Sequence, residues 1–408
     1  MGKRRINVGD FHIGREEREA ITEVLDSGRI SEGTKVREFE RRWAEYVGTK
    51  YCIATSSGAG ALICTLTALK YYKNLKEGTK VITTPLTYIA DSSALTTVGF
   101  EPQYVDVDPV TFAITPQAIE AHLRKAPDLE NYGLILPIDL MGYPVKIDEI
   151  NQIAEKYGLS VLEDSAQAHG TLYKGKKTGS GALLGIFSFY IAHNIQAGEM
   201  GAVVTNDPEL SRLVRKIKAQ GRACDCLVCT RSRGYCPQLE AYQGEDDFDP
   251  RFTHDLIGYN FKTMEFQPAL ALTQIRKVDE IIAKRQRNVR YLNTQLKEYQ
   301  DILQLPLYSD EISYLAYPLI IKKPGVINRK ELRRKLEEAG IETRPLFGCI
   351  PTQQPAYGYL REEYKDKLPH ADYIGKNGFY IGCHQYLEEQ DLEYIVEVFQ
   401  KILRHRNY

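Results

Sequence analysis

The sequence lacks the features that would place the protein in a membrane or on nucleic acid. No apolar run approaches the roughly 18 residues that a membrane span requires. Charged residues near the N-terminus are not followed by the apolar stretch of a secretory signal. The 53 Lys and Arg residues nearly balance the 54 Asp and Glu residues, which leaves a formal net charge of −1. No excess of one sign favours nucleic acid or a membrane surface as partner, and we expect a cytoplasmic protein.

Internal repeats and low-complexity tracts are also missing. The chain has 408 residues, of which 43% are hydrophobic and 26% charged, so a globular protein of more than one domain is expected. Residues 10–48 predict two amphipathic helices separated at Gly33. Beyond them, apolar strand-like segments alternate with helical ones, and a long helix is expected to begin at residues 258–265 and to continue through Lys277 and Arg285. This alternation predicts an α/β fold with a mostly parallel sheet and helices on both faces.

The eight cysteines fall into two groups. One group is scattered among apolar or mixed surroundings, where cysteines behave as small core residues. The other crowds into one polar stretch, residues 221–256, with the spacing Cys-x-Cys-x2-Cys-x6-Cys; its members are Cys224, Cys226, Cys229 and Cys236. In a cytosolic chain such a cluster indicates metal before disulfide. Four thiolates can ligate zinc or hold an iron–sulfur cluster, and the spacing alone favours structural zinc.

A turn near the middle of the chain carries a candidate catalytic histidine. Residues 186–201 predict a short buried strand, a turn with His193, a glycine-marked bend and the start of a second strand. Imidazole titrates near neutral pH and can move protons, and turns leave side chains free to act. Taken alone, a turn histidine is more often an ordinary surface residue.

Two further segments have the chemistry of a ligand site. Ser57-Gly58-Ala59 opens an apolar helix, and the free amides of a helix N-terminus suit a phosphate as well as they suit a simple helix cap. A buried strand ends at Glu163 and Asp164. Ligands of open α/β sheets bind beyond the carboxyl ends of strands, although an isolated aspartate there is more often a helix cap.

Together these segments resemble the DegT-type sugar aminotransferases, which are fold-type I enzymes that use pyridoxal phosphate (PLP). Residues 187–189 match the family's Phe-Ser-Phe run, residues 163–168 match Glu-Asp-x-Ala-Gln-Ala, and residues 258–261 resemble Gly-Tyr-Asn-Tyr. His193 occupies the position of the family's cofactor-binding lysine, and Met200 replaces a glycine in the segment that follows. The resemblance covers nearly the whole chain.

The resemblance implies a complete cofactor site. Asp164 is expected at the pyridine nitrogen, and Gln167 near the ring hydroxyl. An aromatic residue that stacks on the ring is expected at Tyr88. The residues expected to bind the cofactor phosphate are Ser57, Gly58, Ala59, Ser188 and Asn260. Ala59 replaces a threonine of the family, so only its backbone can make this contact. Asn260 is expected to contact the phosphate of the neighbouring subunit's cofactor.

Histidine in place of lysine changes the implied reaction. Imidazole cannot form the Schiff base that a lysine forms with the cofactor aldehyde. The cofactor is therefore expected to be bound non-covalently, as pyridoxamine phosphate (PMP) or as free PLP. A subgroup of the family shares this histidine: the 3-dehydrases, which remove the C3 hydroxyl of nucleotide-linked 4-keto-6-deoxyhexoses. The resemblance implies catalytic roles for His193 and Asp164.

The subgroup contains more than one kind of 3-dehydrase, and the cysteine segment favours one of them. The resemblance to ascarylose-type 3-dehydrases favours an iron–sulfur cluster, [4Fe–4S] or [2Fe–2S], fed by a separate reductase, with zinc as the alternative. Their upstream ligand position holds Ala166 here, so Cys229 or Cys236 would have to supply that ligand. A colitose-type 3-dehydratase that takes its amino group from glutamate, without a cluster, is the second hypothesis. A cofactor-binding protein without catalysis is the third.

Fold-type I architecture also implies a domain division and an assembly. A large cofactor-binding α/β domain is expected over residues 1–255, with the cysteine-rich insertion at 221–256, and a smaller α/β domain over residues 256–408. The enzymes of this type form homodimers with their active sites at the interface, and we expect the same here.

Overall fold

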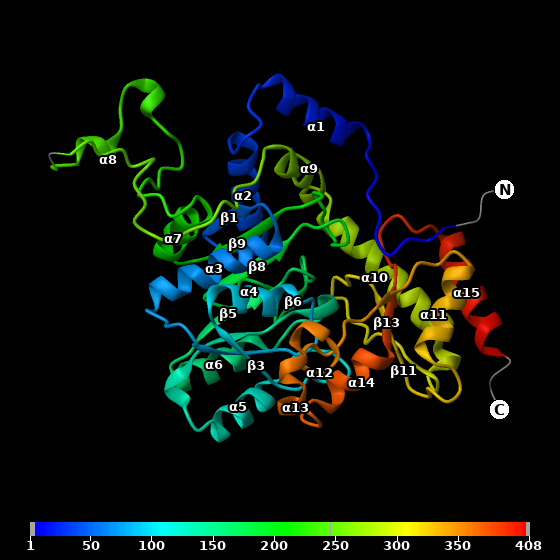
Figure 1. Ribbon diagram of the computed structural model, residues 1–408. Helices are drawn as coiled ribbons and strands as arrows, with labels where there is room; N and C mark the ends of the chain where they lie inside the picture. The colour runs from blue at the N-terminus through cyan, green and yellow to red at the C-terminus, as the bar shows by residue number, and fades with distance from the viewer. Residues whose placement is uncertain (1–4, 245, 405–408) are drawn as a thin grey trace.

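The computed structural model describes residues 5–244 and 246–404 (Figure 1). Its main sheet has seven strands in the order β1-β9-β8-β5-β4-β2-β3. The bounds are β1 Tyr51–Thr55, β2 Lys80–Thr83, β3 Glu101–Tyr104, β4 Tyr132–Leu136, β5 Ser160–Asp164, β8 Leu184–Ser188 and β9 Gly201–Thr205. Only the two pairings that involve β9 are antiparallel, and the other four are parallel. The predicted α/β fold with a mostly parallel sheet is confirmed.

Helices cover both faces of this sheet because its strands are apolar on both sides. On β1, β8 and β9, alternate residues enter two separate cores: Ile53, Ile186 and Val203 face one, while Ala54 and Phe187 face the other. The helices of this part are α1 Arg15–Asp26, α2 Thr34–Val47, α3 Gly58–Tyr72, α4 Ala90–Val98, α5 Pro116–Lys125, α6 Ile147–Tyr157 and α7 Pro208–Lys218. A small hairpin, β6 Leu172–Tyr173 with β7 Lys176–Lys177, lies beside the main sheet.

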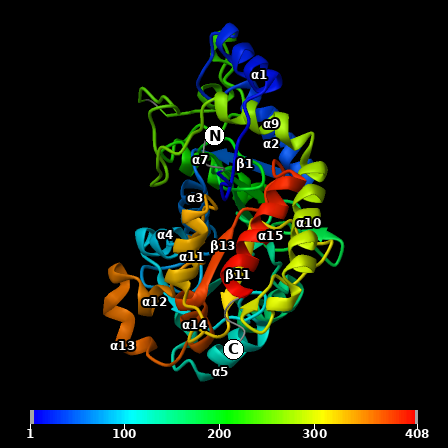
Figure 2. The ribbon, with the colours of Figure 1, turned by 90° about the vertical axis from the view of Figure 1, so that its right-hand side faces the viewer.

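A second, antiparallel sheet lies in the C-terminal part. Its order is β10-β11-β13-β12, with bounds β10 Leu303–Gln304, β11 Tyr317–Ile321, β12 Arg344–Pro345 and β13 Gly378–Ile381. Helices α10, α11 and α15 lie beside it (Figure 2). The helices are α9 Phe266–Ile275, α10 Val278–Gln295, α11 Arg329–Glu338, α12 Ile350–Gln353, α13 Arg361–Tyr364, α14 Pro369–Asn377 and α15 Glu389–Leu403. The domain boundary at residue 255 stays a prediction.

The cysteine-rich insertion leaves the body of the molecule at α7 and returns before α9 (Figure 1). Backbone hydrogen bonds close its stem: Ala223 N–H donates to Thr253 O at 2.8 Å, and Cys224 N–H donates to Pro250 O at 3.0 Å. Among its described residues beyond the stem, the helical elements are α8 Pro237–Glu240 and a 3₁₀ turn, Arg231–Arg233. The expected irregular excursion is therefore present. Further 3₁₀ turns span Leu129–Asn131, Leu140–Gly142, Lys297–Tyr299 and Pro355–Leu360.

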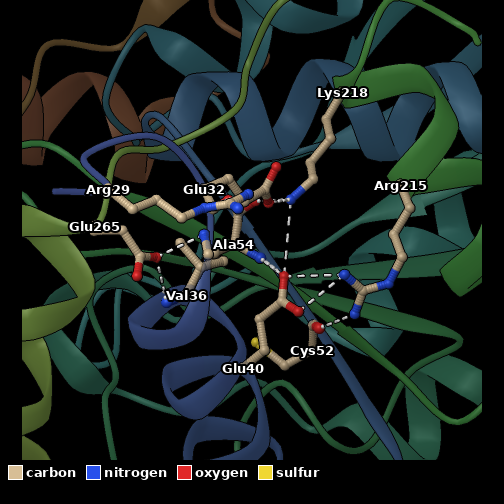
Figure 3. A network of polar contacts seen from close by, with 10 residues as sticks. Arg29, Glu32, Val36, Glu40, Cys52, Ala54, Arg215, Lys218 and Glu265 are labelled. Carbon is tan, nitrogen blue, oxygen red and sulfur yellow. Dashed lines mark hydrogen bonds and ion pairs between the residues drawn. The ribbon is translucent and has the colours of Figure 1, made fainter. Parts of the chain in front are cut away.

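A buried charge network fixes the strand that leads into the candidate phosphate loop (Figure 3). The Glu40 carboxylate accepts a hydrogen bond from Ala54 N–H at 2.9 Å and pairs with Arg215 at 2.9 Å. Lys218 donates to Ala54 O at 2.8 Å and pairs with Glu32. Each buried charge thus has a partner of opposite sign, as burial requires. The network joins α2 and α7 to the end of β1.

Residues 258–265 are not helical, contrary to the sequence expectation of a helix that starts there. Their backbone groups bond to distant segments instead. Phe261 N–H donates to Lys218 O at 2.9 Å, and Phe261 O accepts from Ser56 N–H at 2.8 Å. Glu265 then caps α2, because its carboxylate accepts the amides of Gly33 at 2.7 Å and Val36 at 3.0 Å. Helix α9 begins only after this segment. Within the described residues, no helix is both long and apolar enough to cross a membrane.

Candidate active site

The sheet topology brings the predicted cofactor segments to one edge. Thr55, the last residue of β1, and Ser188, the last residue of β8, both pair with Gly201. Asp164, the last residue of β5, pairs with Ile186 of β8. The loops that follow these strands therefore emerge side by side, at the edge where open α/β sheets bind ligands.

The N-terminus of α3 fits a phosphate. The Ser57 hydroxyl caps the helix by accepting from Gly60 N–H at 3.0 Å. The amides of the first helical residues have no partner within the helix and carry its positive dipole end. Gly58 lies so close to β8 that an added Cβ would be 2.6 Å from the Cβ of Ser188. This approach places the Ser188 side chain beside the helix N-terminus, while Ala59 is exposed.

Asp164 has the setting expected of a carboxylate that faces a protonated ring nitrogen. It is buried, and its Oδ1 accepts from Ala166 N–H at 2.8 Å. Burial and the neighbouring Asp91 carboxyl raise the pKa of Asp164 well above its ordinary value. A cation at this position, such as a protonated pyridine ring, would offset the cost of the buried charge. The residues present therefore fit the cofactor at its ring nitrogen.

Gln167 and Tyr88 take different positions around this edge. The Gln167 side chain is buried, and its Oε1 accepts from Met141 N–H at 3.0 Å. The Tyr88 ring is 62% exposed and contacts the ring of Phe347 edge-on, with centroids 6.1 Å apart. An exposed aromatic side chain at a strand end is free to cover a flat ligand. The roles assigned to Gln167 and Tyr88 stay predictions.

His193 lies on the predicted turn with its side chain half-buried. Its backbone N–H donates to Tyr190 O at 2.9 Å, and its Nδ1 is buried without a hydrogen-bond partner among the described residues. Burial, followed by the positive charge of Arg285, lowers the pKa of His193 to about 4. The imidazole is therefore neutral at neutral pH and can accept a proton.

Residues not singled out from the sequence surround His193. The rings of His169 and His193 lie with centroids 5.9 Å apart. The buried Arg285 guanidinium donates to Leu315 O at 2.8 Å and to Tyr314 O at 3.2 Å. His169 directly follows the Glu-Asp-Ser-Ala-Gln-Ala motif, which was a usable sequence signal. Arg285 lies on helix α10, far along the chain from His193, and no sequence pattern indicated it.

Asn260 is exposed in the single chain. Its backbone pairs with Ala219, and the next residue, Phe261, bonds to Ser56 at the entrance to the phosphate loop. Its predicted contact with the cofactor of a neighbouring subunit stays a prediction.

The four clustered cysteines lie on the insertion, which leaves the body of the molecule after α7 (Figure 1). Cys226 and Cys229 are exposed, whereas Cys224 and Cys236 are half-buried. In the part of the chain that the structure describes, no three His, Cys, Asp or Glu side chains are arranged to hold one metal ion. The structure thus gives no support to the predicted iron–sulfur or zinc centre, and the assignment of these thiols as ligands stays a prediction.

The fold is that of the fold-type I, PLP-dependent enzymes, as the sequence implied. The chain belongs to the DegT/DnrJ/EryC1/StrS aminotransferase family, whose model matches residues 12–400. The predicted family membership is confirmed.

Relatives are similar over nearly their full length. The chain is 31% identical over 396 residues to the lipopolysaccharide biosynthesis protein RfbH of Salmonella typhimurium, covering 95% of this chain and 90% of that protein. It is 29% identical to the GDP-4-keto-6-deoxy-D-mannose 3-dehydratase of Escherichia coli O55:H7, covering 94% and 96%. A crystal structure of GDP-4-keto-6-deoxymannose-3-dehydratase with a trapped PLP-glutamate geminal diamine is 28% identical with a TM-score of 0.84, covering 97% of this chain and 100% of that one.

Proposed function

We propose that the protein is a PMP-dependent 3-dehydratase that removes the C3 hydroxyl of a nucleotide-linked 4-keto-6-deoxyhexose in deoxysugar biosynthesis. The observation that carries the proposal is His193. It replaces the family lysine, is half-buried, and has a pKa lowered to about 4. A neutral base at this position suits proton removal and cannot anchor the cofactor covalently. The names of the full-length dehydratase relatives support the substrate class.

In this proposal a bound cofactor would supply an amine for the C4 ketone and a ring that takes up electrons, which is the chemistry that loss of the C3 hydroxyl requires. His193 would accept the proton from the C4′ carbon of the cofactor. Asp164 keeps the ring nitrogen protonated and so strengthens the electron sink. The first amides of α3, with Ser57 and Ser188, hold the phosphate. Tyr88 covers one face of the ring.

The cofactor amine must be supplied again after each turnover, and we propose glutamate as the donor. This is the colitose-type reaction, and it replaces the iron–sulfur reaction that the sequence analysis placed first. The support comes from the relatives: three of the matched proteins carry a 3-dehydratase name, and a solved structure of GDP-4-keto-6-deoxymannose-3-dehydratase holds a trapped PLP-glutamate geminal diamine. The intact pocket residues Asp164, Gln167 and Ser188 argue against a non-catalytic role.

The test is product analysis with and without glutamate. The protein, PMP and a GDP- or dTDP-linked 4-keto-6-deoxyhexose should yield 3-deoxy sugar in at most one turnover per site, and glutamate should make turnover continuous with release of 2-oxoglutarate. A His193→Asn variant is the control that retains the pocket but lacks the base. A 4-amino sugar that retains its C3 oxygen would refute the proposal and indicate an ordinary aminotransferase.

The cysteine segment supports a second candidate, the iron–sulfur 3-dehydrase with a reductase partner. Its support is the Cys-x-Cys-x2-Cys-x6-Cys spacing and the contact between two of its thiols, since the Cys224 and Cys226 side chains lie within hydrogen-bonding reach of each other. Iron and sulfide analysis of anaerobically purified protein separates the two candidates. Stoichiometric iron and sulfide, with turnover that needs a reductant in place of glutamate, would favour the second; zinc or no metal would favour the first.

We further propose a homodimer in which Asn260 reaches the phosphate of the partner subunit's cofactor. The exposure of Asn260 in the single chain is compatible with that role. Light scattering gives the mass. Mixing an Asn260→Ala chain with a His193→Asn chain tests the sharing, because only mixed dimers then contain one site with both residues intact.

A further inference from the structure

A second buried carboxyl group lies against the carboxylate assigned to the ring nitrogen. Asp91, on α4, is 2% exposed, and Asp164, at the end of β5, is 5% exposed. The two side chains lie within hydrogen-bonding reach of each other. Asp91 was not among the residues singled out from the sequence.

The Asp164 and Asp91 carboxyl groups have different kinds of hydrogen-bond partner. Asp164 Oδ1 accepts from the backbone amide of Ala166 at 2.8 Å, whereas Asp91 Oδ2 faces the hydroxyl of Thr87 at 2.8 Å. Asp91 Oδ1 is buried and has no donor among the described residues. A backbone amide can only donate and therefore favours an ionised acceptor, while a hydroxyl can also accept from a protonated carboxyl.

Two carboxyl groups in contact, both removed from water, cannot both be ionised, and one proton remains on the pair. The other carboxyl that acts on Asp164 is Asp139, which is itself held by Ser165 Oγ at 2.7 Å and Val145 N–H at 2.9 Å. No cation among the described residues forms an ion pair with Asp91 or Asp164. The proton on the pair therefore takes the place of a counter-ion.

We propose that Asp91 is a positioning residue that shares one proton with Asp164, so that the pair presents a single negative charge to a protonated pyridine ring. With the ring nitrogen bound, the charge rests on Asp164 and the proton on Asp91, which donates it to the otherwise unpaired side of the Asp164 carboxylate. Asp91 acts on the cofactor only through Asp164. The inference rests on the cofactor site within the proposed function, and it holds for any reaction that the bound ring supports.

The first measurement follows the stability of the cofactor-free chain against pH, without substrate. A carboxyl group whose pKa is raised by folding stabilises the folded state most below about pH 4. This stabilisation is lost as the pH rises through the raised pKa. Asp91→Asn removes the like charge, keeps an N–H donor toward Asp164, and cannot ionise. Its melting temperature should therefore exceed that of the wild type by an amount that grows from pH 4 to pH 8.

The second measurement is the affinity for PLP alone. Asp91→Asn should bind PLP within about threefold of the wild type, and its bound ring should remain protonated by absorption. Asp91→Ala removes the donor to a buried charge and should weaken binding on the order of tenfold or more. Ser92→Ala is the matched control: it also trims a buried side chain on α4, but its hydroxyl bonds to Tyr104 at 2.8 Å and not to the pair.

Equal losses of PLP affinity in Asp91→Asn and Asp91→Ala would overturn the proposal, because the donor would then be irrelevant. A melting difference that does not change with pH would overturn it too, since no proton would be shared. If Asp164→Asn also binds PLP normally, the ring-nitrogen assignment fails together with the proposal. Loss of sugar turnover alone would concern the proposed reaction and leave this inference standing.

Discussion

The close approach of Gly58 to Ser188 gives a sharp test of the phosphate loop. A Cβ added at residue 58 would lie 2.6 Å from the Ser188 Cβ and 2.9 Å from its Oγ. Ordinary carbon contacts are about 3.5–4 Å, so Gly58→Ala must push the first turn of α3 away from β8 by roughly 1 Å. Such overpacking costs about 1–3 kcal/mol, and the helix propensity of alanine returns at most about 1 kcal/mol.

The effect on cofactor binding should exceed the effect on stability. A displaced amide loses a hydrogen bond to a charged group, which is worth about 1.5–3 kcal/mol, so PLP affinity should fall by about tenfold or more. Equilibrium titration with PLP measures this. Gly325→Ala is the matched control, because nothing lies within 4 Å of its added Cβ. A Gly58→Ala variant with unchanged PLP affinity would refute the assignment of this loop to the phosphate.

Three further changes probe the remaining assignments. His193→Lys should allow a covalent link to the cofactor that borohydride traps, whereas trapping in the wild type would show that another lysine forms this link. In the wild type, exchange of the C4′ proton should persist down to pH 5, because a base with a pKa lowered to about 4 is still mostly neutral at that pH. Asp164→Asn should greatly reduce C4′ exchange while cofactor binding is partly kept, because an amide cannot hold the ring nitrogen protonated; unchanged exchange in deuterated solvent would contradict its role. Cys226→Ser should leave C4′ exchange and glutamate-driven turnover intact if the insertion has no role in the reaction. If the insertion holds a redox cluster, the variant should lose only reductant-driven turnover. If it holds structural zinc, the variant should lose C4′ exchange and turnover together, because the local fold is destabilised.

Local sequence patterns indicated those candidate site residues that lie at the end of a strand or the start of a helix. Ser57 at a helix start and Asp164 at a strand end were readable because capping residues and strand-terminal carboxylates belong to a single element. The alternation of apolar strands with helices predicted the mostly parallel sheet. The sheet then brings these elements to one edge, since parallel strands end on the same side.

Long-range contacts were not readable in the same way. Residues 258–265 have the composition of a helix start, but their amides and carbonyls bond to Lys218 and Ser56, and only the folded topology makes those partners available. From the sequence, Asp91 is one more polar residue of a helix, and only the fold brings its side chain beside Asp164. The pKa of His193 likewise depends on Arg285, which lies on another helix. Sequence reasoning therefore indicated which segments the sheet brings to one edge, but it did not predict the charge states of their side chains.

The environment of residue 193 bears on why a histidine and a lysine at this position would support different chemistry. Burial and the positive charge of Arg285 disfavour a second cation there. A lysine in the same place would have its pKa lowered by the same two causes, and a neutral amine is what attack on an aldehyde requires. A histidine there is kept neutral, which is the form that the proposed role as a base requires. The pocket thus favours a neutral nitrogen at this point, and under the proposed function the identity of the side chain would decide whether that nitrogen bonds to the cofactor or removes its proton.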